Sequence, residues 1–214
     1  IAYPTQDWAN QVFPEDTSEI ALEKLWSAVF KACRCDMSVA DPISAWEKHN
    51  EMLHRRAEKL NELRFESLRY VGPGTELTLG LADGHVWEGG AGQTEDGHWY
   101  NANIPTEEVF TTPHRSKVDG VVTATKPLLY RGTSIEGIRV WFKNGKAVRI
   151  HADKGEQVLR DMIEEDEGAS RLGEVALVNH SSPISASGIL FHETLFDENA
   201  SCHLAFGQSY KKCM

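Results

Sequence analysis

Three side chains that commonly bind metal ions stand in apolar stretches near the end of the sequence. Glu174 opens the strand-like run 174–178, and Glu198 and His203 flank residues 199–202. Removing an ionised carboxylate from water without a partner is costly, so such residues are usually paired or bound to a cation. Carboxylate and imidazole ligands together favour zinc, cobalt or manganese over calcium.

Each of these residues also has a structural interpretation. Arg171 could form a salt bridge with Glu174, and a lone histidine such as His203 is often a satisfied core residue. The five-residue offset between Glu198 and His203 aligns the two on neither a helix nor a strand. From the residues alone, the metal and structural interpretations both stay open.

A second pair of carboxylates follows a proline-led turn. Glu107 and Glu108 precede the apolar pair Val109–Phe110, and adjacent side chains cannot both face one site. Residues 106–108 are equally compatible with a helix start that carries acids in its first turn. The acidic run 164–167 is interpreted as the solvated face of a helix.

The spacing of apolar residues predicts helices followed by strands. Helices are expected over residues 18–35, with Ser18 as N-cap, and over 43–68, where His49 and the neighbouring basic residues would form a solvated face. Turn residues at 71–74 mark the change to strands, and we place a domain boundary near residue 70. Segments 138–142 and 147–152 form the clearest hairpin through Asn144–Gly145, and a helix is expected over 155–170.

Composition excludes several classes of function. The 214 residues carry 22 Lys and Arg against 32 Asp and Glu, and the net charge of −10 repels phosphate backbones. We therefore expect no nucleic-acid partner. The start of the chain is unlike a signal peptide, and no apolar run reaches the length of a membrane span. Four cysteines without regular spacing favour the cytoplasm, and the missing initiator Met suggests a truncated start.

The segments described above resemble the thermophilic-type metalloaminopeptidases, peptidase family M29, which includes the aminopeptidase T, aminopeptidase S and PepS group. The resemblance extends in the family's order from residue 3 to residue 210. The matching stretches are 3–5, 72–75, 103–111, 168–178 and 195–203.

The resemblance implies a set of site residues. The family's metal-binding carboxylates fall on Glu108, Glu174 and Glu198, its first histidine ligand on His203 and its active-site tyrosine on Tyr210. Glu107 is the fallback for Glu108. Glu174 is expected to bridge two divalent ions, and the choice of general base among the glutamates stays open. Zinc, cobalt and manganese all suit these ligands.

The resemblance also implies fold and function. The fold expected is α+β: residues 1–70 would be the end of an N-terminal α/β domain with connecting helices, and 71–214 a β-rich α+β catalytic domain. The function expected is metal-dependent removal of N-terminal residues from peptides with a free N-terminus, by a homodimer, through a metal-activated water.

Two alternatives to this enzyme stay open. Family members use a His-x-Asp pair further along, and the sequence stops at Met214 before such a motif. Either the parent protein continues, or the chain is a truncated or catalytically silent metal-binding module. A glycosidase with sugar stacked on Trp87, Trp99 or Trp141 is the other alternative.

Overall fold

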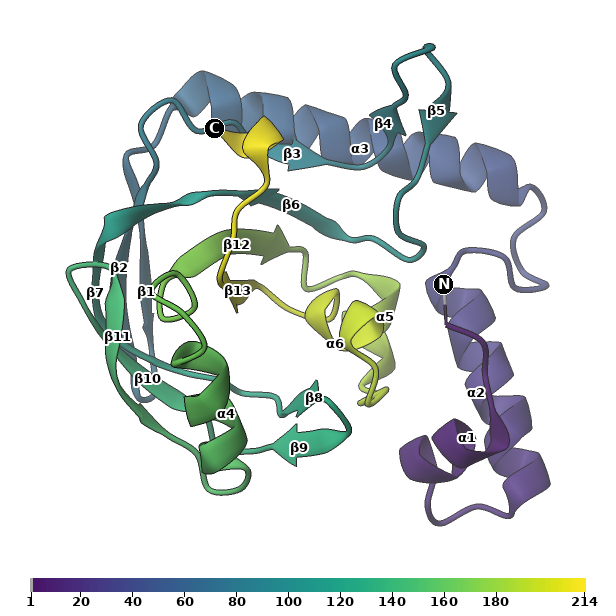
Figure 1. Cartoon of the computed structure of the whole chain (residues 1–214). Coiled ribbons are helices and arrows are strands. Elements are labelled where there is room, and N and C mark those ends of the chain that lie inside the picture. The colour runs from purple at the N-terminus through teal and green to yellow at the C-terminus, as the bar shows by residue number, and fades with distance from the viewer. Residues whose placement is uncertain (1) are drawn as a thin grey trace. The chain divides into compact units, whose positions relative to one another are not determined.

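A computed structural model describes residues 2–214 and shows helices together with mostly antiparallel strands (Figure 1). The predicted α+β class is confirmed. No helix among these residues is both long and apolar enough to cross a membrane. The helices are α1 Gln6–Val12, α2 Ser18–Ala32, α3 Pro42–Leu63, α4 Glu156–Ile163, α5 Pro183–Ser187, α6 Thr194–Glu198 and the 3₁₀ helix η1 Lys211–Cys213.

The strands form four sheets among the described residues. Their bounds are β1 Ser67–Gly72, β2 Thr75–Leu81, β3 Glu88–Gly89, β4 Gly92–Gln93, β5 Trp99–Tyr100, β6 Glu108–Thr111, β7 Pro113–Thr123, β8 Leu128–Tyr130, β9 Thr133–Ile135, β10 Arg139–Lys143, β11 Lys146–His151, β12 Leu172–Val178 and β13 His203–Phe206. The larger sheets have the orders β1-β2-β7-β10-β11 and β13-β12-β6-β3, and the pairs β4-β5 and β8-β9 complete the set.

The chain divides into two compact units. One comprises the residues up to Ala57 together with Gly89–Val109 and Leu177–Cys202. Its apolar core joins α1 and α2 to the segments around α5 and α6, where Phe191 and Phe196 are fully buried. The boundary that we predict near residue 70 stays a prediction.

The other unit comprises Glu58–Glu88, Phe110–Ala176 and His203–Met214. It contains the five-stranded sheet and most of the four-stranded one. Alternate residues of β2, Leu77 and Leu79, are completely buried, as expected for a strand with one face on a core. Helix α4 packs beside β9 and β11 and buries Leu159 and Ile163.

The predicted helices exist but end earlier than expected. Helix α2 has Thr17 rather than Ser18 at the N-cap position, with no side-chain capping bond, and it ends at Ala32 instead of residue 35. Helix α3 stops at Leu63, where Arg64 adopts a left-handed conformation (φ 49°), so Leu68 belongs to β1. Helix α4 ends at Ile163, before Asp166 accepts backbone hydrogen bonds from the two residues that follow Glu167.

The predicted hairpin at Asn144–Gly145 is confirmed. Strands β10 and β11 pair in antiparallel register, and both turn residues have positive φ, 51° and 76°, as a tight primed turn requires. A Cβ on Gly145 would lie 1.9 Å from the carbonyl oxygen of Arg115. Only glycine therefore fits at the second turn position.

Candidate metal centre

Glu174 and His203 lie on the neighbouring strands β12 and β13. Ala176 is paired directly with His203, and Glu174 with Ala205. Residues two apart on a strand share a face, so Glu174 and His203 are diagonal neighbours on one face of the sheet. His203 Nε2 lies 3.6 Å from Glu174 Oε1, and both side chains are less than one-fifth exposed.

A β-bulge immediately precedes Glu174. The β12–β13 register shifts between Leu172 and Glu174, which leaves Gly173 as the extra residue. A Cβ on Gly173 would lie 2.5 Å from the carbonyl oxygen of Gly207 and 2.6 Å from backbone atoms of Gln208. Glycine thus lets the segment after β13 cross closely over the residue before Glu174.

Glu108 supplies the third member of the group. It is the first residue of β6, the strand next to β12 in the sheet order, and it is buried. One carboxylate oxygen each of Glu108 and Glu174 and a ring nitrogen of His203 lie within 4.8 Å of one another. Residues 106–108 do not begin a helix, so that interpretation is wrong.

The donor set suits a divalent ion. Oxygen and nitrogen ligands bind zinc at about 2.0–2.2 Å, and two such atoms at a tetrahedral angle are about 3.4 Å apart. The 3.6 Å between His203 Nε2 and Glu174 Oε1 is close to that spacing. With Glu108, two carboxylates and one imidazole would hold the ion and leave a position for a water or substrate.

Glu107, the fallback for Glu108, has a different set of contacts. Its carboxylate forms an ion pair with Arg34, with an Nη2–Oε2 distance of 2.9 Å, and its side chain is 4% exposed. His49 Nε2 lies 3.8 Å from the same oxygen. Glu107 is not part of the three-residue group.

His49 is buried rather than solvated, which corrects the expectation for this face of α3. Its Nε2 lies 2.7 Å from the carbonyl oxygen of Thr106. A carbonyl can only accept, so Nε2 carries the proton and donates it. Burial lowers the pKa of His49, and the negative charge of Glu107 partly opposes this effect. The lowered pKa favours the neutral ring.

Arg34, His49 and Asn199 are the residues of this region that sequence reasoning missed. Arg34 stands between two cysteines after a helix, and His49 lies among charged residues that resemble a solvated face. Asn199 falls within a quoted family stretch but has no charge that would attract attention. Their partners are distant in sequence, so no local pattern indicates their contacts.

The remaining predicted site residues lie outside the three-residue group. Glu198 is the last residue of α6, whereas His203 begins β13, so the five-residue offset spans the change from helix to strand. Tyr210 directly precedes η1 and is 61% exposed, and its ring centroid lies 5.8 Å from that of Phe110. Arg171 donates to the carbonyl oxygen of Arg115 at 2.6 Å.

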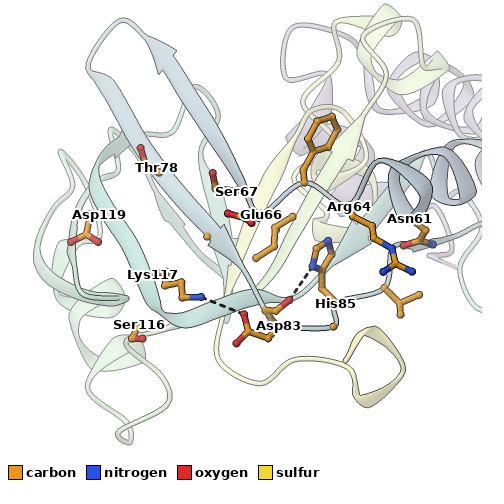
Figure 2. A pocket seen from close by; sticks show the side chains of 16 residues that line it. Asn61, Arg64, Glu66, Ser67, Thr78, Asp83, His85, Ser116, Lys117 and Asp119 are labelled. Atoms are coloured by element: carbon orange, nitrogen blue, oxygen red, sulfur yellow. Dashed lines mark hydrogen bonds and ion pairs between the residues drawn. The ribbon is translucent and has the colours of Figure 1, made fainter.

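A cavity lies elsewhere in the second unit. It measures about 1050 Å³, and its lining includes none of the three grouped residues. Figure 2 shows Lys117 directed toward Asp83 and His85 toward a nearby carbonyl, so several of its polar groups already have protein partners. We do not place the chemistry there.

Comparison with known proteins identifies the family. A family model described as thermophilic metalloprotease (M29) matches residues 1–214. The chain belongs to this family. It is 53% identical over 212 residues to aminopeptidase T of Thermus thermophilus, covering 99% of this chain and 52% of that protein. The recognition made from the sequence is confirmed.

Another relative and a solved structure agree. Aminopeptidase AmpS of Bacillus subtilis is 50% identical over 203 residues, covering 95% of this chain and 49% of AmpS. The structure of wild-type AmpT from Thermus thermophilus matches with a TM-score of 0.90 at 51% identity, covering 99% of this chain and 51% of that one. The chain thus spans about half the length of the relatives it matches.

Membership of a metalloprotease family contradicts the glycosidase alternative. Of the three tryptophans named for it, Trp99 is 65% exposed, whereas the other two are covered by protein atoms. Trp87 is 1% exposed and belongs to the core. Trp141 packs against two guanidinium groups, with Arg139 Cζ 5.0 Å and Arg149 Cζ 4.5 Å from its ring centroid. Neither ring is available as a sugar platform.

Proposed function

We propose that the protein containing this chain is a metal-dependent aminopeptidase that hydrolyses N-terminal residues from peptides. The observation that carries the proposal is the grouping of Glu108, Glu174 and His203 in a chain of the M29 family. The relatives named above are aminopeptidases, which supports the same activity here.

In this proposal the three grouped residues bind a divalent ion, and Glu198 contributes to a second. Zinc, cobalt and manganese all suit the ligands. Two ions would lower the pKa of a water molecule and polarise the scissile carbonyl. Glu174 would contribute its carboxylate to holding both ions, and its negative charge would offset the repulsion between the two cations.

The remaining chemistry is assigned to side chains of this chain. A glutamate that stands beside the reacting water and is not bound to both ions would accept the water's proton and pass it to the leaving amine. The Tyr210 hydroxyl would donate a hydrogen bond to the oxygen that becomes negative. Its exposure and its place beside Phe110 leave the phenol accessible to a substrate.

Location and assembly are part of the same proposal. All four cysteines are free thiols, which is compatible with a cytoplasmic protein. The family resemblance supports a homodimer. The catalytically silent metal-binding module remains the competing function and predicts metal binding without turnover.

The test measures release of leucine from a leucyl chromogenic amide by the purified protein after chelation, and again after cobalt or zinc is added back. We expect activity to be lost and then restored. Metal binding by titration calorimetry without turnover at any metal concentration would favour the silent module. Activity that survives complete chelation would contradict the proposed chemistry.

A further inference from the structure

Three side chains distant in sequence fix the two residues before Glu108. Arg34 holds the carboxylate of Glu107 through its two terminal nitrogens. Bidentate arginine–carboxylate pairs are directional as well as strong, so the contact orients Glu107 in addition to neutralising it. The pair is shielded from water, with side-chain exposures of 16% for Arg34 and 4% for Glu107.

His49 fixes the residue one position earlier. It donates from Nε2 to the carbonyl oxygen of Thr106, and its Nδ1 accepts from Arg34 Nη2 at 3.1 Å. The neutral ring therefore uses both nitrogens, one on the backbone and one on the guanidinium. This arrangement links the peptide that precedes Glu107 to the same arginine.

Asn199 fixes the backbone of Glu107 from a third direction. Its Oδ1 accepts from the Glu107 amide at 2.7 Å, and its Nδ2 donates to the carbonyl oxygen of Leu195 at 2.9 Å. The residue is 1% exposed. Because Asn199 directly follows Glu198, one amide joins the segments that carry two proposed metal ligands.

Arg34 is itself held in place. It follows the end of α2 in a left-handed conformation (φ 54°), a position that favours glycine. Its guanidinium lies 5.3 Å from the ring centroid of Trp46, whose indole nitrogen donates to the carbonyl oxygen of Cys33 at 2.7 Å. The helix end, the indole and the ion pair together determine where the guanidinium lies.

We propose that Arg34, His49 and Asn199 are positioning residues that hold Glu108 in its metal-binding geometry by fixing Thr106 and Glu107. The inference rests on the proposed function, because it takes Glu108 as a metal ligand. Residues that orient metal ligands without binding the metal themselves typically lower metal affinity by about 10–100-fold when they are removed. We expect losses in this range, with the ligands themselves unchanged.

The experiment titrates the chain with Co²⁺ alone and records both affinity and the visible absorption of the bound ion. The test variants are Arg34→Gln and Asn199→Ala. Matched controls are Arg55→Gln, which breaks an exposed ion pair with Glu51, and Asn101→Ala, which removes a reciprocal amide pair with Asn50. Near-ultraviolet circular dichroism establishes which variants are folded.

We expect both test variants to bind Co²⁺ about 10–100-fold more weakly than the wild type. Their absorption at saturating Co²⁺ should also change, because Glu108 coordinates in an altered geometry. A purely structural role would leave the spectrum of the folded, saturated fraction unchanged. Arg34→Lys keeps the charge but not the two-pronged guanidinium, so its Co²⁺ affinity should lie between those of the wild type and Arg34→Gln. Arg34→Lys replaces Arg34→Gln in the experiment if Arg34→Gln does not fold.

Wild-type affinity and spectrum in folded Arg34→Lys and Asn199→Ala would overturn the inference. The ligand variant Glu174→Gln separates this failure from failure of the proposed function. If Glu174→Gln abolishes Co²⁺ binding while the positioning variants bind normally, only the positioning role is wrong. If Glu174→Gln binds Co²⁺ as the wild type does, the metal centre itself is wrong.

Discussion

Glu107 and Glu108 are adjacent and both buried, but they occupy two different chemical settings. Glu107 pairs with a cation built into the protein, the guanidinium of Arg34. Glu108 groups with Glu174 and His203, a set of donors whose cation would come from solution. Alternation along the chain directs the two side chains apart, so one residue can stabilise the fold while its neighbour is available for a metal.

The comparison predicts opposite responses to loss of charge. A carboxylate that neutralises a buried guanidinium contributes to folding at all metal concentrations. A carboxylate beside another carboxylate contributes more when a cation is bound, because the cation offsets the repulsion between the like charges. Stability measured with and without metal should therefore distinguish the two settings.

The largest expected effect is on Glu107. Glu107→Gln leaves the largely shielded Arg34 without its counter-charge, and removing one partner of a buried pair costs about 3–5 kcal/mol. Urea unfolding of the metal-free chain measures the loss. The control Glu51→Gln removes an exposed partner of Arg55 and should cost less than about 1 kcal/mol. Equal losses in the two variants would contradict a stabilising role for the Arg34–Glu107 pair.

The second effect concerns Glu174 and depends on metal. At a free Co²⁺ concentration of about 100 times the dissociation constant, the wild type should gain about 2.7 kcal/mol in unfolding free energy. Glu174→Gln should lose most of that gain and change the stability little without metal, because it removes the repulsion from Glu108 together with the charged contact to His203. Denaturant titrations at both metal concentrations provide the measurement. A large loss of stability without metal would place Glu174 in the same class as Glu107.

The third effect separates catalysis from metal binding. Tyr210→Phe should reduce turnover of a leucyl amide by about 10²-fold, the effect of losing one donor to a developing oxyanion. Metal content, measured by atomic emission, should stay at the wild-type value because the phenol is not a ligand in our assignment. Unchanged turnover would remove Tyr210 from the mechanism.

The smallest effect tests the bulge beside Glu174. Gly173→Ala places a methyl group within 2.6 Å of backbone atoms of the 207–208 segment, and overpacking of this kind costs about 1–3 kcal/mol. Gly72→Ala is the control, since a Cβ there meets nothing within 4 Å. Thermal unfolding of the two variants is compared with the wild type. Equal melting temperatures for all three proteins would show that the 207–208 segment moves aside easily.

Local sequence determined much of the secondary structure. Apolar spacing indicates α2, α3 and α4, and Asn144–Gly145 indicates the β10–β11 hairpin, because these features depend on residues close in the chain. Helix ends were less predictable. The left-handed Arg64 that ends α3 is an unusual conformation for arginine, so its identity gives no stop signal.

Sequence also determined the chemical classes at the candidate site. The apolar setting of Glu174 and the company of His203 are compatible with both metal binding and structural roles, and it is the family resemblance that names Glu108 before Glu107. What the residues alone could not decide is which adjacent glutamate has which role. That depends on Arg34 and His49, which lie 73 positions from Glu107 and 57 from Thr106 in the chain.

Tertiary structure decided the contacts that join distant segments. The β12–β13 register brings Glu174 and His203 onto one face, and a single inserted glycine sets that register locally. Asn199 receives the Glu107 amide across 92 positions of sequence. The partners in such contacts are far apart in the sequence and meet only when the chain has folded. They persist in the fold because buried polar groups are almost always hydrogen-bonded.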